Sequence, residues 1–369
     1  MNSAKEVGQG VSVIIPCYNH GQFLLEAIAS AEDEPLVDEI IIVNDGSTTL
    51  VTLEILEKLQ RENYQIFNIE NRGLSGARNF GIEQARCPYI LPLDADNKLE
   101  RGFLKDALKV LDENLKIGVV YGDRQVFGQQ EQRVEMAEFR VSRLLLGNYI
   151  DACALFRRQV WEDVGGYDSA IPDQLGYEDW DFWLGAVEAS WQFSYVKKVA
   201  FQYRSRPDSM VSGCNLPANR KRLFQYICSK HSKLYSAQFA DVFSTKEAQR
   251  LEALDEAFQY SQEISKVKVE LAIAQQERDQ YFEKNKVLKD RLQWIEESLD
   301  NTYALGENRE ADQRQVEEAI AQRNYWEKEH GKALEELNRL RQSHHQILNS
   351  RWWRLKAKVG RSVRKLIGQ

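Results

Sequence analysis

The chain has 369 residues, of which 43% are apolar and 28% charged, and its net charge is −7. This length indicates two or three structural units, and the apolar share suffices for one α/β core. Because no run of 18 apolar residues occurs, the composition excludes a membrane-spanning helix. The start of the chain has no secretory apolar region and the five cysteines have no metal-ligand spacing, which predicts a cytoplasmic protein with reduced thiols.

The first hundred residues alternate short β-branched segments with helical patterns. We expect strands at 11–16, 39–43, 65–69 and 89–93, with helical spacing of apolar residues over 23–31, 53–59 and 79–85. This alternation predicts a doubly wound, mostly parallel α/β sheet. Ligands of such sheets bind beyond the carboxyl ends of the strands, which is where the motifs described next are expected to lie.

The second expected strand ends at Asn44-Asp45-Gly46-Ser47. Gly46 permits a tight turn, so Asp45 is expected to project at the sheet edge. A carboxylate in that position can accept the imide N–H of a uracil or thymine ring. Taken alone, the segment is better explained as an ordinary Asp-Gly turn.

A Gly-rich loop, residues 71–81, leads into the next expected helix. Its glycine spacing differs from that of a dinucleotide-binding fingerprint. It carries Arg72 and Arg78, and a guanidinium suits a base or a diphosphate.

Leu93-Asp94-Ala95-Asp96-Asn97 follows the fourth expected strand. In an extended segment, residues two apart point to the same side, so the carboxylates of Asp94 and Asp96 are expected to converge. Two hard oxygen donors suit Mg²⁺ or Mn²⁺ shared with a diphosphate, and such an ion stabilises the departing nucleoside diphosphate. The alternative is a helix N-cap ahead of residues 99–108.

Residues 176–183 place three carboxylates among four aromatic side chains. A carboxylate beside apolar rings is desolvated and becomes more basic, which suits a general base, and aromatic faces can stack on sugar. The alternative is a capped amphipathic helix whose aromatic side chains belong to the core, and this is our expectation for Phe182.

From about residue 236, proline is absent, glycine is rare, and Glu, Gln, Lys and Arg dominate. Two runs, over 264–299 and 316–348, repeat core-type positions at alternating steps of three and four, with an interruption around Gly306. Sustained spacing of this kind predicts a coiled coil or a long helical hairpin, and a single solvated helix is the alternative.

No acidic residue follows Glu336, whereas nine basic residues do, so the chain before this point carries a net charge of −16. An acidic body with a basic tail indicates an anionic partner at the tail. Five apolar residues of the tail share one helical face: Trp352, Leu355, Val359, Val363 and Leu366. This pattern favours an anionic membrane surface, the alternative being a solvated end of the coiled coil, and no nucleic acid is expected because the rest of the chain is acidic.

Taken in order, these motifs resemble those of the inverting family 2 glycosyltransferases, which have the GT-A fold. The resemblance covers roughly residues 10–235. It rests on Pro16-x-Tyr18-Asn19, Asn44-Asp45-Gly46-Ser47, Ala77-Arg78-Asn79-x-Gly81, Asp94-x-Asp96 and Glu178-Asp179. It implies a GT-A catalytic domain over 1–235, which we expect to be followed by a helical coiled-coil region over 236–349 and a basic amphipathic tail over 350–369.

The resemblance also implies roles for individual residues. The nucleotide-sugar donor, UDP- or dTDP-linked, is expected to contact Pro16, Tyr18, Asp45, Arg72, Arg78 and Asp94. Asp96 is expected to bind Mg²⁺ or Mn²⁺, and Asp179 to deprotonate the acceptor hydroxyl. Glu178 and Trp180 are expected to shape the acceptor side.

Residues 203–210 look like the family segment that closes over the diphosphate. Many relatives have a histidine near the position of Arg206. Its absence puts a protein ligand to the metal from this segment in doubt, and Arg204 and Arg206 are expected to contact phosphate instead. The stretch 349–354 resembles the Trp-Arg-rich ends of some bacterial surface-polysaccharide transferases.

The function expected from all this is a metal-dependent inverting transfer of a hexose-type sugar to a hydroxyl of a glycan or lipid-linked acceptor in surface-polysaccharide synthesis. The protein is expected in the cytoplasm or peripherally on the membrane, with a homo-oligomer formed through the coiled coil. One rival is an inactive scaffold, which retention of Asp45, Asp94, Asp96 and Asp179 argues against. The other, a sugar-phosphate nucleotidylyltransferase, normally opens with a Gly-rich basic loop that residues 11–22 lack.

Overall fold

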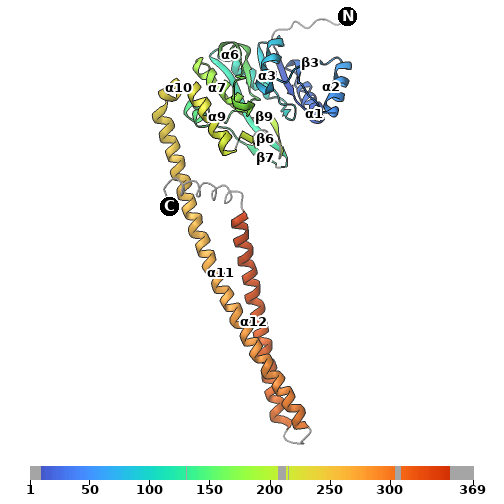
Figure 1. The fold of residues 1–369 in the computed structure, drawn as a ribbon, viewed down its shortest axis with the longest axis vertical. Helices are drawn as coiled ribbons and strands as arrows, with labels where there is room; N and C mark the ends of the chain where they lie inside the picture. Colours follow the sequence, from blue (N-terminus) through green and yellow to red (C-terminus); the bar gives the residue numbers. More distant parts are fainter. Residues whose placement is uncertain (1–9, 130, 207–212, 215, 304–308, 350–369) are drawn as a thin grey trace. The chain divides into compact units, whose positions relative to one another are not determined.

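The computed structural model describes residues 10–129, 131–206, 213–214, 216–303 and 309–349. The chain divides into two compact units, Met1–Lys246 and Glu247–Gln369, which are treated one at a time below (Figure 1). The predicted tail, residues 350–369, lies outside the described residues.

A mixed sheet forms the centre of the first unit, with described strands in the order β3-β2-β1-β4-β8-β6-β9-β5 and β7 paired to β6. The strands are β1 Val11–Cys17, β2 Val37–Asp45, β3 Gln65–Ile69, β4 Tyr89–Pro92, β5 Lys98–Leu99, β6 Ile117–Gly128, β7 Gln132–Val134, β8 Leu155–Arg157 and β9 Gln192–Ser205. β3, β2, β1 and β4 are parallel neighbours, whereas β8 is antiparallel to β4 and β6. The four strands expected in the first hundred residues therefore form one continuous parallel block of the sheet, and β6 and β9 form a second parallel pair.

Helices connect these strands and cover the sheet (Figure 1). In the first unit they are α1 Gly21–Glu32, α2 Leu50–Arg61, α3 Gly73–Gln84, α4 Phe103–Glu113, α5 Val141–Leu146, α6 Arg158–Val164, the short 3-10 helix η1 Pro172–Gln174, α7 Glu178–Glu188, α9 Pro217–Lys230 and α10 Ser232–Ala237. The predicted α/β architecture is thereby confirmed.

The core has two layers, one on each face of the sheet. Ile14 and Ile15, neighbours in β1, are both fully buried but belong to different layers, because successive side chains of a strand point to opposite faces. Ile15 packs in the layer of Leu24 and Phe103, and Ile14 in the layer that holds the aromatic residues of α7. The β-branched run of β1 is thus read correctly as a strand buried on both faces.

The second unit is built from α11 Phe239–Tyr303, most of which lies beyond Lys246, and α12 Arg309–Asn349. The two helices lie side by side as an antiparallel hairpin (Figure 1). Their seam is mixed: the Tyr281 and Trp326 rings are 5.6 Å apart, Asn285 Nδ2 donates to the Trp326 carbonyl at 3.3 Å, and Leu288 and Leu337 are buried. Within the described part of the chain, no helix combines the length and apolarity needed to cross a membrane.

Candidate active site

The parallel pairing of β1 with β2 and β4 brings three sequence motifs to one edge of the sheet. Asp45 is the last residue of β2, Tyr18 follows the end of β1, and Asp94 comes two residues after β4. This is the edge at which open α/β sheets bind ligands.

The Asp45 carboxylate lies in a tight backbone turn and is 3% exposed. Its Oδ1 accepts the backbone N–H of Arg72 at 2.7 Å. Burial raises the pKa of Asp45, although the backbone donors of Arg72 and Gly73 oppose the shift. Gly46 has φ of +71°, and a Cβ there would lie 2.9 Å from the backbone nitrogen of Asn71, so glycine is required.

The other residues expected around the nucleotide differ in exposure. Tyr18 is 48% exposed beside this turn, whereas Pro16 is buried within β1. Asn19 helps to hold the turn, since its Oδ1 accepts the N–H groups of Thr48 and Thr49 at 2.8 and 3.0 Å. Arg72 is exposed and directly precedes α3.

Arg78 differs from the expectation of a diphosphate contact, because its side chain is only 1% exposed. Its Nη2 donates to Asp94 Oδ1 at 2.8 Å and its Nη1 to Glu178 Oε1 at 2.6 Å. The guanidinium also lies over the Tyr167 ring, 5.5 Å from its centre. Arg78 therefore joins the motif after β4 to the start of α7 from beneath the surface.

Asp94 and Asp96 stand in a turn, whereas the sequence suggested an extended segment. The Asn97 N–H donates to the Asp94 carbonyl at 2.9 Å, which closes the turn. The two carboxylates still lie close enough to interact. Burial raises the pKa of Asp96 to about 6, and the negative charge of Asp94 contributes to this shift. Predicting their proximity from strand alternation therefore used the wrong local geometry.

Two arginines from the end of β9 reach this turn. Arg206 Nη2 is 3.1 Å from Asp96 Oδ2, and Arg204 Nε donates to the Asp96 carbonyl at 3.0 Å. Phe23 of α1 lies under both guanidinium groups, at 4.5 Å from Arg204 and 5.2 Å from Arg206. Two cations are thus stacked on one ring at the edge of the Asp96 carboxylate.

Glu178 and Asp179 open α7, and their surroundings differ. Glu178 is paired with Arg78, whereas Asp179 Oδ2 accepts the amide of Asn148 at 2.7 Å and Oδ1 accepts the N–H of Trp180 at 2.8 Å. Burial, and then the charges of Glu178 and Asp151, raise the pKa of Asp179 well above its usual value. A carboxylate of raised pKa is suited to take a proton.

Asp151 belongs to the same cluster and was not singled out from the sequence. Burial and the charge of Asp94 raise its pKa, and Arg124 Nη1 is 3.7 Å from its Oδ2. Its position in an irregular loop before β8 has no periodicity that marks it. The one available signal is a carboxylate within the otherwise apolar stretch Tyr149–Phe156.

Trp180 lies in the core, away from any surface that an acceptor could touch. Its side chain is fully buried, its Nε1 donates to the Leu144 carbonyl at 2.7 Å, and its ring meets that of Phe224. It anchors α7 and thereby positions Asp179. Phe182 is likewise fully buried, as expected.

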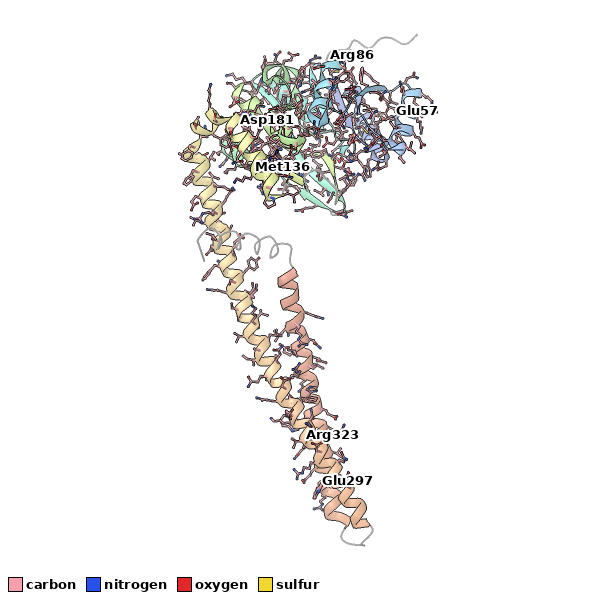
Figure 2. The ribbon with its side chains drawn as sticks, viewed as in Figure 1. Glu57, Arg86, Met136, Asp181, Glu297 and Arg323 are labelled. Atoms are coloured by element: carbon pink, nitrogen blue, oxygen red, sulfur yellow. The ribbon has the colours of Figure 1, made fainter. Side chains whose placement is uncertain are left out.

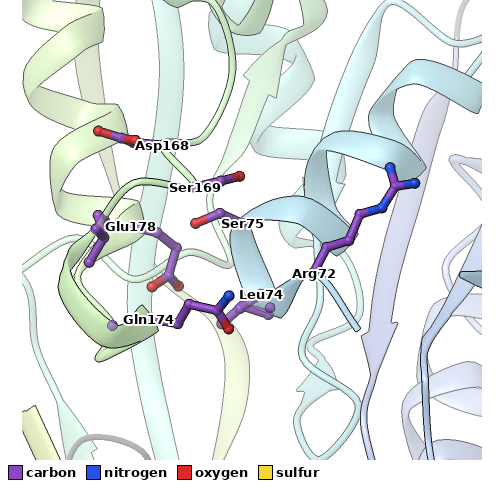
Figure 3. A pocket seen from close by; sticks show the side chains of 10 residues that line it. Arg72, Leu74, Ser75, Asp168, Ser169, Gln174 and Glu178 are labelled. Carbon is purple, nitrogen blue, oxygen red and sulfur yellow. The ribbon is translucent and has the colours of Figure 1, made fainter. Parts of the chain in front are cut away.

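A small pocket lies between the start of α3 and the loop before α7 (Figure 3). Arg72, Ser75, Gln174 and Glu178 line it together with the backbone of Gly73. Three non-glycine residues directly before α7, namely Asp173, Gln174 and Tyr177, have positive φ. Such strain persists only where the surroundings fix it, so this loop is held in a defined shape next to Glu178.

The donor set fits a divalent cation of the Mg²⁺ type in part. Asp94 and Asp96 supply carboxylate oxygens at one turn, and a small hard cation is commonly held by one or two carboxylates plus substrate phosphates. Among the described residues, no group of three or more His, Cys, Asp or Glu side chains forms a complete metal cage. The remaining ligands would therefore have to come from substrate or water.

Comparisons with known proteins agree with this geometry. Residues 12–165 match the profile of Glycosyl transferase family 2. Chondroitin synthase of Pasteurella multocida is 25% identical over 266 residues, which are 70% of this chain and 27% of that protein. The uncharacterized glycosyltransferase YwdF of Bacillus subtilis is 26% identical over 262 residues, 67% of this chain and 94% of that protein.

The fold is shared with a solved structure. A crystal structure of S. aureus TarS 1-349 in complex with UDP-GlcNAc superposes with a TM-score of 0.51 at 21% identity, covering 61% of this chain and 66% of that one. Among the sequence relatives, this chain spans about a quarter of the length of chondroitin synthase and nearly all of YwdF. Residues 12–165 thus resemble a family 2 glycosyltransferase domain, the first unit has the mixed α/β fold of TarS, and both findings support a glycosyltransferase that uses a nucleotide-sugar donor.

Proposed function

We propose that this protein transfers a hexose-type sugar, with inversion, from a UDP- or dTDP-linked donor to a hydroxyl of a glycan or lipid-linked acceptor in surface-polysaccharide synthesis. The observation that supports the proposal is the buried Arg78, which joins Asp94 to Glu178, the neighbour of Asp179, while Asp45 ends β2 at the same edge of the sheet. A base pocket, a diphosphate site and a proton acceptor are the three parts that this reaction needs.

Asp179 acts in this scheme as the general base. Its carboxylate takes the proton of the acceptor hydroxyl while the hydroxyl oxygen attacks the anomeric carbon from the face opposite the nucleotide. The C–O bond to the nucleoside diphosphate breaks as the new glycosidic bond forms, so the configuration inverts. Asn148 orients the base through Oδ2, and Trp180 fixes the start of the helix that carries it.

The diphosphate is held by positive charge around the Asp94–Asp96 turn. Arg204 and Arg206 lie at this turn and suit phosphate oxygens, while Arg72 is exposed and its backbone N–H donates to Asp45. A Mg²⁺ or Mn²⁺ ion bound by Asp94 and Asp96 would supply further positive charge to the leaving group. Arg78 keeps Asp94 and Glu178 in place, and the Asp94 side chain stays 33% exposed.

The relatives support the class of donor and acceptor. TarS was crystallised with UDP-GlcNAc, and chondroitin synthase is named for a polysaccharide product. Glu178 faces the pocket of Figure 3 together with Ser75 and Gln174, which offer neutral donors and acceptors for sugar hydroxyls. We assign the acceptor side to Glu178, with Trp180 acting only through the position of α7.

The C-terminal parts carry separate proposals. Residues 236–349 would mediate self-association, and residues 350–369 would attach the enzyme to an anionic membrane surface on its cytoplasmic side. The first rests on the helical hairpin of α11 and α12, and the second on the basic amphipathic pattern of the sequence.

Calorimetric titration of the full chain with UDP, dTDP and GDP, each with and without Mn²⁺, tests the proposal. We expect metal-dependent binding of UDP or dTDP, with weaker binding of GDP. Asp45→Asn is the matched variant, because it keeps the shape of the side chain but replaces the charged carboxylate that is proposed to accept the imide N–H of the base. If none of the three nucleotides binds to protein shown to be folded, the chain is an inactive scaffold instead.

A further inference from the structure

Six apolar side chains of α11 form an exposed row, here named the outer stripe: Leu251, Phe258, Val269, Ile273, Val287 and Trp294. Each is more than half exposed. All six lie within the second unit. This many large exposed apolar residues on one helix are unusual in a protein that acts alone.

The six residues share one side of the helix. Leu251, Val269 and Val287 are each 18 residues apart, which is five turns of an α-helix with about 3.6 residues per turn. At about 100° per residue, Phe258, Ile273 and Trp294 fall within roughly 40° of that line. The outer stripe is therefore straight and runs from Leu251 to Trp294.

This side is different from the one that contacts α12. Ile264, Ala274 and Leu288 are buried in the hairpin, and they lie roughly 100° to 140° around the helix from the stripe. The partner helix α12 thus covers one side of α11, and the residues of the outer stripe stay exposed.

The stripe is nearly symmetric end to end. Leu251 and Trp294 are equally far from a midpoint between residues 272 and 273, and so are Phe258 and Val287. Val269 and Ile273 flank the same region. A second copy laid antiparallel would place Leu251 opposite Trp294 and Phe258 opposite Val287, which is the self-complementarity that a two-fold interface requires.

Charged residues beside the stripe follow the same symmetry. On one edge, antiparallel copies would bring Arg250 to Glu297 and Lys268 to Asp279. On the other edge, they would bring Asp255 to Arg291 and Lys266 to Glu277. The midpoints of these four pairs lie between residues 271 and 274, as does that of one repulsive pair, Glu270 with Glu277. Attractive pairs therefore outnumber the repulsive one in the arrangement that also matches the apolar positions.

A parallel arrangement fits these charges less well. Pairing across the edges of two parallel, in-register helices joins a residue to one about five positions along the partner. This puts Glu247 beside Glu252 and Lys286 beside Arg291, two repulsive pairs that offset the attractive pairs Arg250 with Asp255 and Asp279 with Lys284. Charge complementarity therefore selects the antiparallel orientation.

The area is sufficient for a specific contact. Covering one large apolar side chain removes on the order of 100 Å² from water, so six from each copy bury on the order of 1,200 Å². This reaches the lower limit for stable protein interfaces.

We propose that the outer stripe of α11 is the self-association surface of this protein, and that a second copy docks on it antiparallel. The two hairpins then pack back to back through α11, with α12 of each copy on the outside. This proposal is independent of the catalytic one.

Sedimentation velocity of the full chain at micromolar concentration tests it. We expect a dimer, and we expect the double variant Val269→Glu, Val287→Glu to raise the dimer dissociation constant at least tenfold. Both valines are exposed, so circular dichroism should show an unchanged helix content. Leu115→Glu is the matched control, because Leu115 is 77% exposed but lies outside the stripe, and this variant should stay dimeric.

Cysteine cross-linking tests the orientation. Under mild oxidation, a mixture of Leu251→Cys and Trp294→Cys proteins should form a disulfide-linked dimer, while either variant alone should not. The single variants also control for the native cysteines. A wild-type monomer at every concentration, a dimer unaffected by the two glutamates, or self-linking of Leu251→Cys without the mixed product would each overturn the proposal.

Discussion

Asp179 and Glu178 are adjacent carboxylates with opposite surroundings, and this difference separates their roles. Glu178 is held by the buried Arg78, so its charge is already neutralised within the protein. Asp179 has amide and backbone donors, and burial with two acidic neighbours raises its pKa. The residue better suited to accept a proton is therefore Asp179.

Asp179→Asn should lower the rate of sugar transfer by about 10²- to 10⁴-fold, the usual contribution of a general base. The dissociation constant for the nucleotide should change little, since the residues proposed to bind the nucleotide lie at the ends of β1, β2 and β4, whereas Asp179 lies in α7. Because only the ionised carboxylate accepts a proton, the wild-type rate should rise with pH through the raised pKa of Asp179. Product formation and calorimetric titration measure the two quantities. Loss of nucleotide binding in this variant would assign Asp179 to the donor site, and Glu57→Gln, far away on α2 (Figure 2), serves as control.

Asp96→Ala should weaken nucleotide binding in the presence of Mn²⁺ while leaving metal-free binding nearly unchanged. The physical reason is that, in the proposed scheme, the Asp96 carboxylate is a ligand of the metal ion that the diphosphate shares, and alanine removes it. Titrations with and without Mn²⁺ compare the two. Equal affinities in the variant and the wild type under both conditions would remove Asp96 from the metal site.

At the residue scale, the sequence points to candidate residues but not to their contacts. Asp45, Asp94, Asp96 and Asp179 are predicted as site residues because each follows a strand or opens a helix, and their roles stay predictions. The burial of Arg78 was not expected from the sequence and that of Trp180 was only the alternative, because both depend on tertiary neighbours such as Glu178 and Leu144 that are distant in the sequence. Asp151 was missed for the same reason.

The elements around the site are positioned by close packing of α3 on the sheet. Gly81 faces β1 and β2, and a Cβ there would lie 2.5 Å from Ile14 Cγ2 and 3.1 Å from Val43 Cγ2. The position is fully enclosed by β-branched side chains, which have little freedom to move aside.

Gly81→Ala should therefore destabilise the protein by about 1–3 kcal/mol, the usual cost of overpacking a core. Gly331→Ala is the control, because no atom lies within 4 Å of its Cβ position in α12 and alanine favours a helix. Chemical denaturation of the first-unit transition measures the free energy of unfolding. A neutral Gly81→Ala would show that α3 can move away from the sheet.

A charged cluster holds α9 and α10 against α7. The buried Asp181 (Figure 2) is 3.0 Å from His231 Nε2 and 2.7 Å from Lys230 Nζ, and His231 Nδ1 is 2.9 Å from Glu188. Burial lowers the pKa of His231, but the bonds to Asp181 and Glu188 outweigh it, so the pKa is raised above 6.5. Lys230 also reaches Asp168 at 2.6 Å, which extends the cluster to the loop after α6.

His231→Gln should remove a pH-dependent part of the stability. Because the folded pKa is raised, the contribution of His231 is fully present below about pH 6.5 and is lost as pH rises through the folded pKa. The stability gap between wild type and variant should thus shrink from acidic toward alkaline pH. Urea denaturation across this range measures it, and a gap that widens with pH would contradict the assignment.

For the whole molecule, periodicity predicted the existence of the helical region but not its pairing. The three-and-four spacing from residue 264 onward fits a coiled coil, a hairpin or a single helix equally well. Contacts such as Trp326 with Tyr281 and Asn285 select the hairpin within one chain. The outer stripe was not predicted, because its residues recur every 18 positions and do not follow the heptad spacing of a coiled coil.

The proposed role of the tail concerns the whole molecule, since it would attach the enzyme to an anionic membrane surface. Residues 350–369 combine basic charge with a row of apolar side chains, and attachment to an anionic membrane draws on both.

Deleting residues 350–369 should release the protein from vesicles containing anionic lipid while leaving transfer to a soluble acceptor unchanged. Vesicle co-sedimentation and a product assay measure the two effects on the same preparation. Replacing Trp352 and Trp353 by Ser keeps the basic charge but removes apolar area, so it should weaken binding less than the deletion does. Binding should also fall as salt is raised, because part of the attraction is electrostatic. If the deleted protein bound vesicles as tightly as the full chain, membrane attachment would have to lie elsewhere in the molecule.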